Sequence, residues 1–139
     1  MKGHSGQIRV LLVDDEEGYV HVLAKRMTKR QVEVSFALSG SEAIQILRKK
    51  DFDVAVVDLK MEDMDGIEVL KIFKKMDPEL PVVMLTGHGS EKAARDGLAL
   101  GAFDYLTKPC DLEELLATII KAAEQRSEYS GNVQGTSGG

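Results

Sequence analysis

The chain has 139 residues, of which 43% are apolar and 29% charged, a composition that fits one globular domain with a sizeable core. Its net charge of −5 argues against a general nucleic-acid binder and against a basic helix on a membrane surface. Cys110 is the only cysteine, which excludes an internal disulfide and a cysteine-based metal site. No apolar run is long enough to span a bilayer, and residues 1–7 lack the apolar stretch of a signal peptide. We therefore expect a cytoplasmic domain that binds neither membranes nor nucleic acids directly.

Predicted strands and predicted helices alternate along the chain. The strands are expected at Ile8–Val13, Val32–Ala37, Val54–Val57, Pro81–Leu85 and Phe103–Leu106. The first, third and fourth runs lack polar alternation, as is typical of parallel strands that are buried on both faces. Apolar stripes at helical spacing follow each strand, around residues 20–27, 43–47, 67–73, 90–100 and 111–126. This fivefold alternation predicts a doubly wound α/β domain with a parallel sheet and helices on both faces.

The two ends of the chain differ in composition from the part between them. Residues 1–7 are polar and are expected to be flexible, with the domain itself covering residues 8–126. Residues 127–139 are rich in Ser and Gly and contain almost no apolar residues. This composition predicts a flexible tail, either a linker remnant or residues left by cloning.

Polar residues stand where several predicted strands end. The first strand leads into Asp14 and Asp15, the third into Asp58 and the fourth into Thr86, while Lys108 lies in the loop after the fifth. In an open α/β sheet, ligands bind beyond the carboxyl ends of the strands. We therefore expect these five residues, far apart in sequence, to meet at one edge of the sheet.

The chemistry of these residues suits phosphoryl transfer. Carboxylates about 5 Å apart repel by roughly 3 kcal/mol per pair at an effective dielectric constant of about 20, so a cation is needed to offset them. Mg²⁺ fits best because it uses few carboxylates, keeps its waters and accepts phosphate oxygens. Lys108 adds a positive charge and Thr86 a hydroxyl donor. Asp58, which projects from the middle strand, is the preferred nucleophile, with Asp14 and Asp15 better placed as metal ligands.

Several segments of the chain resemble the receiver domain of bacterial two-component response regulators. These segments are Val10–Glu16, Asp58–Met61, Met64–Gly66, Thr86–Gly87 and Gly101–Pro109, and the resemblance runs from about residue 8 to 123. It implies a flavodoxin-like (βα)5 fold with the strand order 2-1-3-4-5. It further implies that Asp58 is the phosphoacceptor, and that the side chains of Asp14, Asp15 and Asp58 and the backbone carbonyl of Lys60 hold Mg²⁺, with Mn²⁺ as a substitute.

The resemblance also implies a switch and its partners. Thr86 and Lys108 would bind the phosphoryl oxygens, Tyr105 would follow Thr86 on activation, and the bond between Lys108 and Pro109 would be cis. A sensor histidine kinase or phosphotransfer protein would donate the phosphoryl group. The surface formed by residues 90–100, 103–106 and 111–126 would then act on an output domain or downstream protein, and could join two copies of the chain. Such a domain catalyses only its own phosphorylation and dephosphorylation.

One departure from the family pattern lies in the loop after Asp58. Receiver domains usually have Pro, and often Gly, after the position of Met61, whereas this chain has Glu62 and Asp63. The substitution predicts a more acidic and more flexible loop, and leaves the role of Asp58 unaffected.

Three other functions fit the same fold class. A flavin-binding electron carrier would need a Ser/Thr/Gly-rich phosphate loop after the first strand, where the acidic run at residues 14–17 would repel a phosphate. An aspartyl-phosphate phosphohydrolase would carry a second Asp where Glu16 stands, and would also need a cap over its substrate. An unphosphorylated interaction module would not need the complete polar set. Phosphate incorporation at Asp58 would separate these possibilities.

Overall fold

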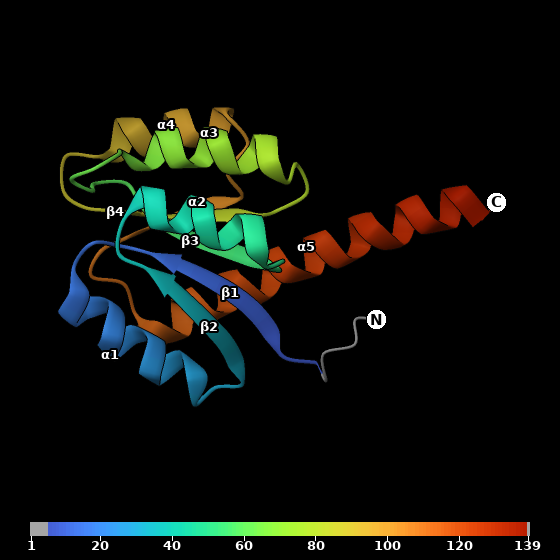
Figure 1. Cartoon of the computed structure of the whole chain (residues 1–139), viewed down its shortest axis with the longest axis horizontal. Helices are drawn as coiled ribbons and strands as arrows, with labels where there is room; N and C mark the ends of the chain where they lie inside the picture. The colour runs from blue at the N-terminus through green and yellow to red at the C-terminus, as the bar shows by residue number, and fades with distance from the viewer. Residues whose placement is uncertain (1–5, 139) are drawn as a thin grey trace.

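The computed structural model describes the backbone of residues 6–138 and the side chains of residues 6–127. Within that range the chain forms a five-stranded parallel sheet with the order β2-β1-β3-β4-β5, flanked by helices (Figure 1). The strands are β1 (Ile8–Val13), β2 (Val32–Ala37), β3 (Val54–Asp58), β4 (Val82–Thr86) and β5 (Asp104–Thr107). The helices are α1 (Glu17–Thr28), α2 (Gly40–Lys49), α3 (Gly66–Met76), α4 (Glu91–Ala99) and α5 (Leu112–Gly138). The predicted fold class and strand order are both confirmed.

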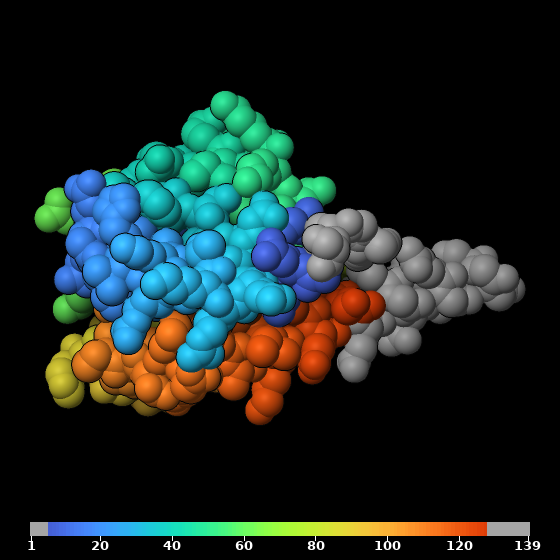
Figure 2. Space-filling view, turned by 90° about the horizontal axis from the view of Figure 1, so that it is seen from below, coloured from blue at the N-terminus to red at the C-terminus, as the bar shows by residue number. Residues whose placement is uncertain are grey.

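Each face of the sheet is covered by its own set of helices. Alternate side chains of β1 point to opposite faces, so Leu11 and Val13 join the core under α2, α3 and α4, whereas Val10 and Leu12 join the core against α1 and α5. The space-filling view shows α1 and α5 side by side on the second face (Figure 2). Because the central strands are buried on both sides, their sequences read as the continuous apolar runs described above.

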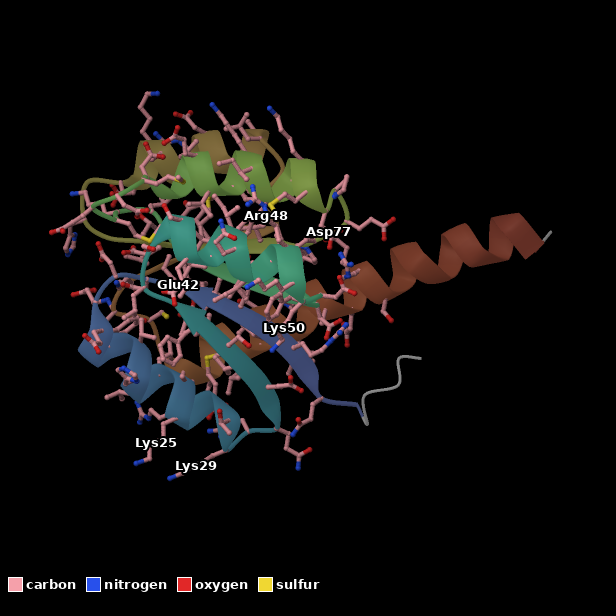
Figure 3. All side chains as sticks on the ribbon, in the orientation of Figure 1. Lys25, Lys29, Glu42, Arg48, Lys50 and Asp77 are labelled. Carbon is pink, nitrogen blue, oxygen red and sulfur yellow. The ribbon has the colours of Figure 1, made fainter. Side chains whose placement is uncertain are left out.

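Charged side chains cover the outer faces of the helices. Lys25 in α1 and Lys29 directly after it, for example, point into solvent (Figure 3). At the opposite end of the sheet from its carboxyl edge, Arg126 of α5 forms a two-pronged ion pair with Asp77, which directly follows α3. In the part of the chain that is described, no helix is long and apolar enough to cross a bilayer.

The structure differs from the sequence prediction mainly at the C-terminus. We expected the last helix to end near Arg126, but α5 continues to Gly138. Adding residues to an existing helix is much easier than nucleating a new one, so weak helix formers can extend it. The predicted flexibility of residues 1–5 lies outside the described part of the chain, and the domain boundaries at residues 8 and 126 remain predictions.

Candidate functional site

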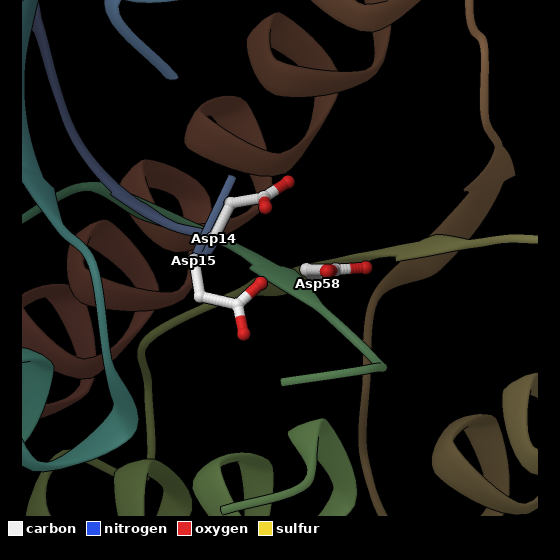
Figure 4. A group of neighbouring side chains, drawn as sticks. All are labelled: Asp14, Asp15 and Asp58. Carbon is white, nitrogen blue, oxygen red and sulfur yellow. The ribbon is translucent and has the colours of Figure 1, made fainter. Parts of the chain in front are cut away.

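Three aspartates converge at the carboxyl edge of the sheet (Figure 4). The strand register explains why: Val13 of β1 pairs with Val57 of β3, so the residues that follow them, Asp14 and Asp58, lie next to each other. One carboxylate oxygen from each of Asp14, Asp15 and Asp58 lies within 4.8 Å of the others. Asp14 is 0% exposed and Asp58 6% exposed, so at least two of these charges are removed from bulk water.

Lys108 brings a positive charge into this acidic cluster. Its Nζ lies 3.0 Å from Asp14 Oδ2 and 3.9 Å from Asp58 Oδ2. A third carboxylate, that of Glu16, is closer still at 2.7 Å, and the same Nζ lies 4.5 Å from the ring centre of Tyr19. The sequence alone assigns neither Glu16 nor Tyr19 a role in holding Lys108. The acidic run at residues 14–17 could have indicated that Glu16 lies near a cation, but no sequence pattern indicated the contact with Tyr19.

The remaining predicted residues lie around this cluster. Thr86 is buried, and its hydroxyl donates a hydrogen bond to the carbonyl of Gly87 over 3.2 Å. The backbone amide of Lys108 donates to the carbonyl of Thr86, and the Lys108–Pro109 bond is cis, the geometry that the resemblance implies. Tyr105 is half-buried against the core under α2, α3 and α4. Lys60 lies at the start of the loop between β3 and α3.

The cluster carries more negative charge than Lys108 neutralises. Burial, and then the negative charge of Asp14, raise the pKa of Asp58 to about 6, while Lys108 and the Lys60 amide act in the opposite direction. Burial lowers the pKa of Lys108, but hydrogen bonds to Glu16 and Asp14 outweigh it, so the net pKa of the ammonium is raised. Excess anionic charge among oxygen donors favours a hard divalent cation, and Asp14, Asp15 and Asp58 are the side chains that could hold one.

The loop between β3 and α3 is held by hydrogen bonds. The backbone amide of Glu62 donates to Asp15 Oδ2 over 2.9 Å. The carboxylate of Asp63 accepts from the amides of Gly40 and Ser41, at 3.0 and 3.1 Å, and from the Ser41 hydroxyl at 3.1 Å. We expected a looser loop from the Glu62–Asp63 pair, but Asp63 ties it to α2.

Comparison with known proteins identifies the family. The family described as "Response regulator receiver domain" matches residues 10–120, which is most of the chain. The chain belongs to this family. The match covers all three clustered aspartates as well as Thr86 and Lys108.

Two known proteins illustrate the similarity of this receiver domain to others. The transcriptional regulatory protein GlrR of Escherichia coli K12 is 38% identical over 116 residues, which are 84% of this chain and 26% of that protein. A receiver domain protein from Clostridium thermocellum superposes with a TM-score of 0.85 at 30% identity, covering 88% of this chain and 98% of that one. The chain thus spans about a quarter of the curated relatives that it matches.

Gly66 packs directly against the backbone of Asp58 and Leu59. A Cβ atom on Gly66 would lie 2.5 Å from the carbonyl oxygen of Asp58 and 2.7 Å from Cα of Leu59, so the end of β3 would have to move. Gly66→Ala should therefore lower the free energy of unfolding by about 1–3 kcal/mol, measured by urea denaturation. Gly18→Ala, in α1, is the matched control, because a Cβ atom on Gly18 would point into open space. Equal stabilities of the two variants would contradict this interpretation.

Proposed function

We propose that this domain is the phosphoacceptor of a two-component phosphorelay, with Asp58 accepting a phosphoryl group in a Mg²⁺-dependent reaction. The observation that carries the proposal is the convergence of Asp14, Asp15 and Asp58 within 4.8 Å of one another, beside Lys108. The donor would be a phosphohistidine on a sensor histidine kinase or phosphotransfer protein, as the receiver family implies. The site fits Mg²⁺ because its side-chain donors are oxygens and its buried charges are incompletely balanced.

The proposed reaction places each residue in a defined role. A carboxylate oxygen of Asp58 attacks the phosphorus atom, the new O–P bond forms as the P–N bond of phosphohistidine breaks, and the histidine nitrogen keeps the electron pair. Asp14, Asp15 and the carbonyl of Lys60 would hold the Mg²⁺, which would neutralise charge on the transferring oxygens. Lys108, which bonds to Glu16 and Asp14 in the structure, would turn towards the phosphoryl oxygens. Hydrolysis of the acyl phosphate would later reset the domain.

We further propose that the surface of α4, β5 and α5 transmits the signal. Leu98, Leu100 and Ile120, on or beside α4 and α5, are large apolar side chains that remain 39%, 44% and 46% exposed. Such exposure suits contact with an output domain, a downstream protein or a second copy of the chain. The relatives are named as transcriptional regulatory proteins, and this chain matches about a quarter of their length. We therefore propose that this domain does not itself bind nucleic acid, and that transcriptional output would come from an output domain or a downstream protein. We place this domain in the cytoplasm.

Incubation of the protein with a small phosphodonor tests the proposed function. Acetyl phosphate with Mg²⁺ should give one phosphoryl group per chain, visible by intact mass and released by hydroxylamine, as expected of an acyl phosphate. Chelation of the metal should prevent labelling. A pure interaction module would stay unlabelled, and a phosphohydrolase would instead turn over a phosphate ester such as p-nitrophenyl phosphate.

The proposed switch depends on Thr86. Its hydroxyl now bonds to Gly87, and can donate to a phosphoryl group on Asp58 only by moving towards it, which would leave space for Tyr105. Thr86→Ala should therefore still permit phosphorylation, but the amides of residues 87–106 should no longer change their hydrogen-exchange protection when the site is phosphorylated or carries a mimic. The measurement is hydrogen exchange with and without a beryllofluoride mimic.

Thr107→Ala is the matched control for that experiment, because Thr107 pairs with Thr86 in the sheet but is exposed. It should respond to the mimic as the parent does. Equal protection of residues 87–106 in Thr86→Ala and in the parent would show that Thr86 does not couple the site to the surface.

A further inference from the structure

Asp63 caps the amino end of helix α2 from a distant loop. The first amides of a helix have no partners within the helix and need acceptors from elsewhere. Ser39 supplies one of these acceptors, since its hydroxyl accepts from the amide of Glu42. Asp63, more than 20 residues further along the chain, serves the amides of Gly40 and Ser41 with one carboxylate oxygen each. The hydrogen bond from the Gly40 amide keeps the pKa of Asp63 below its usual range, so the carboxylate stays charged next to the positive end of the helix dipole.

The loop is attached to the acidic cluster one residue before Asp63. The amide of Glu62 donates to Asp15 Oδ2 at 2.9 Å. Two consecutive residues therefore hold the loop at two points: Glu62 to Asp15 at the carboxyl edge of the sheet, and Asp63 to the first turn of α2. Because the two residues are adjacent, loss of the contact between Asp63 and α2 would also loosen the contact between the Glu62 amide and Asp15.

Close packing makes α2 a firm support for this contact. A Cβ atom on Gly40 would lie 3.0 Å from Met64 Sδ and 3.0 Å from Val69 Cγ2, so the first turn of α2 rests directly on the loop and on α3. Gly40 is itself buried. Glycine at this position allows the close approach that brings the α2 amides within reach of Asp63.

We propose that Asp63 is a positioning residue for the metal site: by anchoring the loop to α2, it holds the Glu62 amide against Asp15, and Lys60 near Asp58, before any cation binds. The proposal rests on the proposed function of the cluster as a Mg²⁺ site. A loop that is already ordered loses less conformational entropy when the cation binds than a loop that must become ordered. Removal of the anchor therefore weakens Mg²⁺ binding even though Asp63 does not contact the ion.

The test combines metal affinity with a measurement made without metal. In Asp63→Ala, the Mg²⁺ Kd from calorimetry at 25 °C should rise by about tenfold. In the metal-free protein, exchange of the Glu62 amide should accelerate by about tenfold or more, with amides of the central strands unchanged. Asp63→Asn keeps one oxygen acceptor and should show smaller changes in both quantities, and it provides the measurement if the alanine variant does not fold.

Ser39→Ala is the matched control, because it removes a hydrogen bond from the same end of α2 without touching the loop. It should lower stability while leaving the Mg²⁺ Kd and the exchange of the Glu62 amide within about twofold of the parent. The positioning role would be overturned if Asp63→Ala left the Mg²⁺ Kd and the exchange rate of the Glu62 amide unchanged. It would also be overturned if Ser39→Ala changed these two quantities as much as Asp63→Ala does. Absence of Mg²⁺ binding or phosphate uptake in the parent would instead overturn the proposed function.

Discussion

Asp58→Asn should abolish phosphate incorporation from a small phosphodonor while leaving the fold intact. The amide nitrogen and neutral amide oxygen that replace the carboxylate cannot act as the nucleophile, so no acyl phosphate forms. Asparagine has nearly the same size as aspartate, and the buried end of β3 needs no repacking. The measurement is intact mass after incubation with acetyl phosphate and Mg²⁺, with circular dichroism to show that the variant is folded.

Asp51→Asn is the control, since Asp51 is an exposed aspartate just before β3 and should be labelled as the parent is. Stoichiometric phosphate in Asp58→Asn that resists hydroxylamine would point to a Ser or Thr acceptor and contradict the assignment of Asp58.

The same variant should be more stable than the parent at neutral pH when metal is absent. The folded-state pKa of Asp58 is raised from 3.8 to about 6, so its charge destabilises the folded protein above pH 6, and this penalty disappears as the pH falls towards 3.8. Removing the charge should add on the order of 2 kcal/mol to the free energy of unfolding at pH 7. Urea denaturation in the presence of a chelator, at pH 7 and at pH 4.5, would show whether the difference shrinks at the lower pH.

Mg²⁺ should stabilise the parent protein, and Asp15→Asn should remove most of that gain. A cation that binds only the folded state adds about 2.7 kcal/mol to the free energy of unfolding at a hundredfold excess over its Kd. The variant loses one anionic ligand but keeps an oxygen that can accept the hydrogen bond from the Glu62 amide. Thermal unfolding with and without Mg²⁺ provides the measurement.

Asp51→Asn again serves as the control, because it removes one negative charge from the chain without touching the acidic cluster. Its gain from Mg²⁺ should equal that of the parent. If Asp15→Asn gained as much, the cation would have to bind elsewhere on the molecule.

The sheet could be predicted from the sequence because strands buried on both faces must be apolar along their whole length. The predicted bounds of Ile8–Val13 and Val32–Ala37 match β1 and β2. The convergence of the three aspartates could also be predicted, because the ends of parallel strands meet at one edge. The strand order, in contrast, came from the resemblance to receiver domains, since alternation alone allows several orders.

The contacts of Asp63 and Glu16 could not be predicted. Asp63 reaches Gly40 and Ser41 across more than 20 residues, and Glu16 reaches Lys108 across 92, and no local pattern specifies pairs this far apart. From the sequence alone, Glu62 and Asp63 predict a more flexible loop, because the usual Pro and Gly are missing there. Whether an exposed carboxylate loosens or anchors a loop depends on the donors that face it, and here these are the first amides of α2.

The ion pair between Arg126 and Asp77 attaches α5 to the residue that follows α3. The helix has 27 residues and is about 40 Å long at 1.5 Å per residue, and its first half is seated against the sheet. The ion pair lies near the middle of the helix, where hydrogen bonds of 3.3 and 3.1 Å join the Arg126 guanidinium to the two carboxylate oxygens of Asp77. The ion pair therefore fixes α5 to the end of α3 at the edge of the sheet opposite the acidic cluster, so the two helices are tied together far from the site.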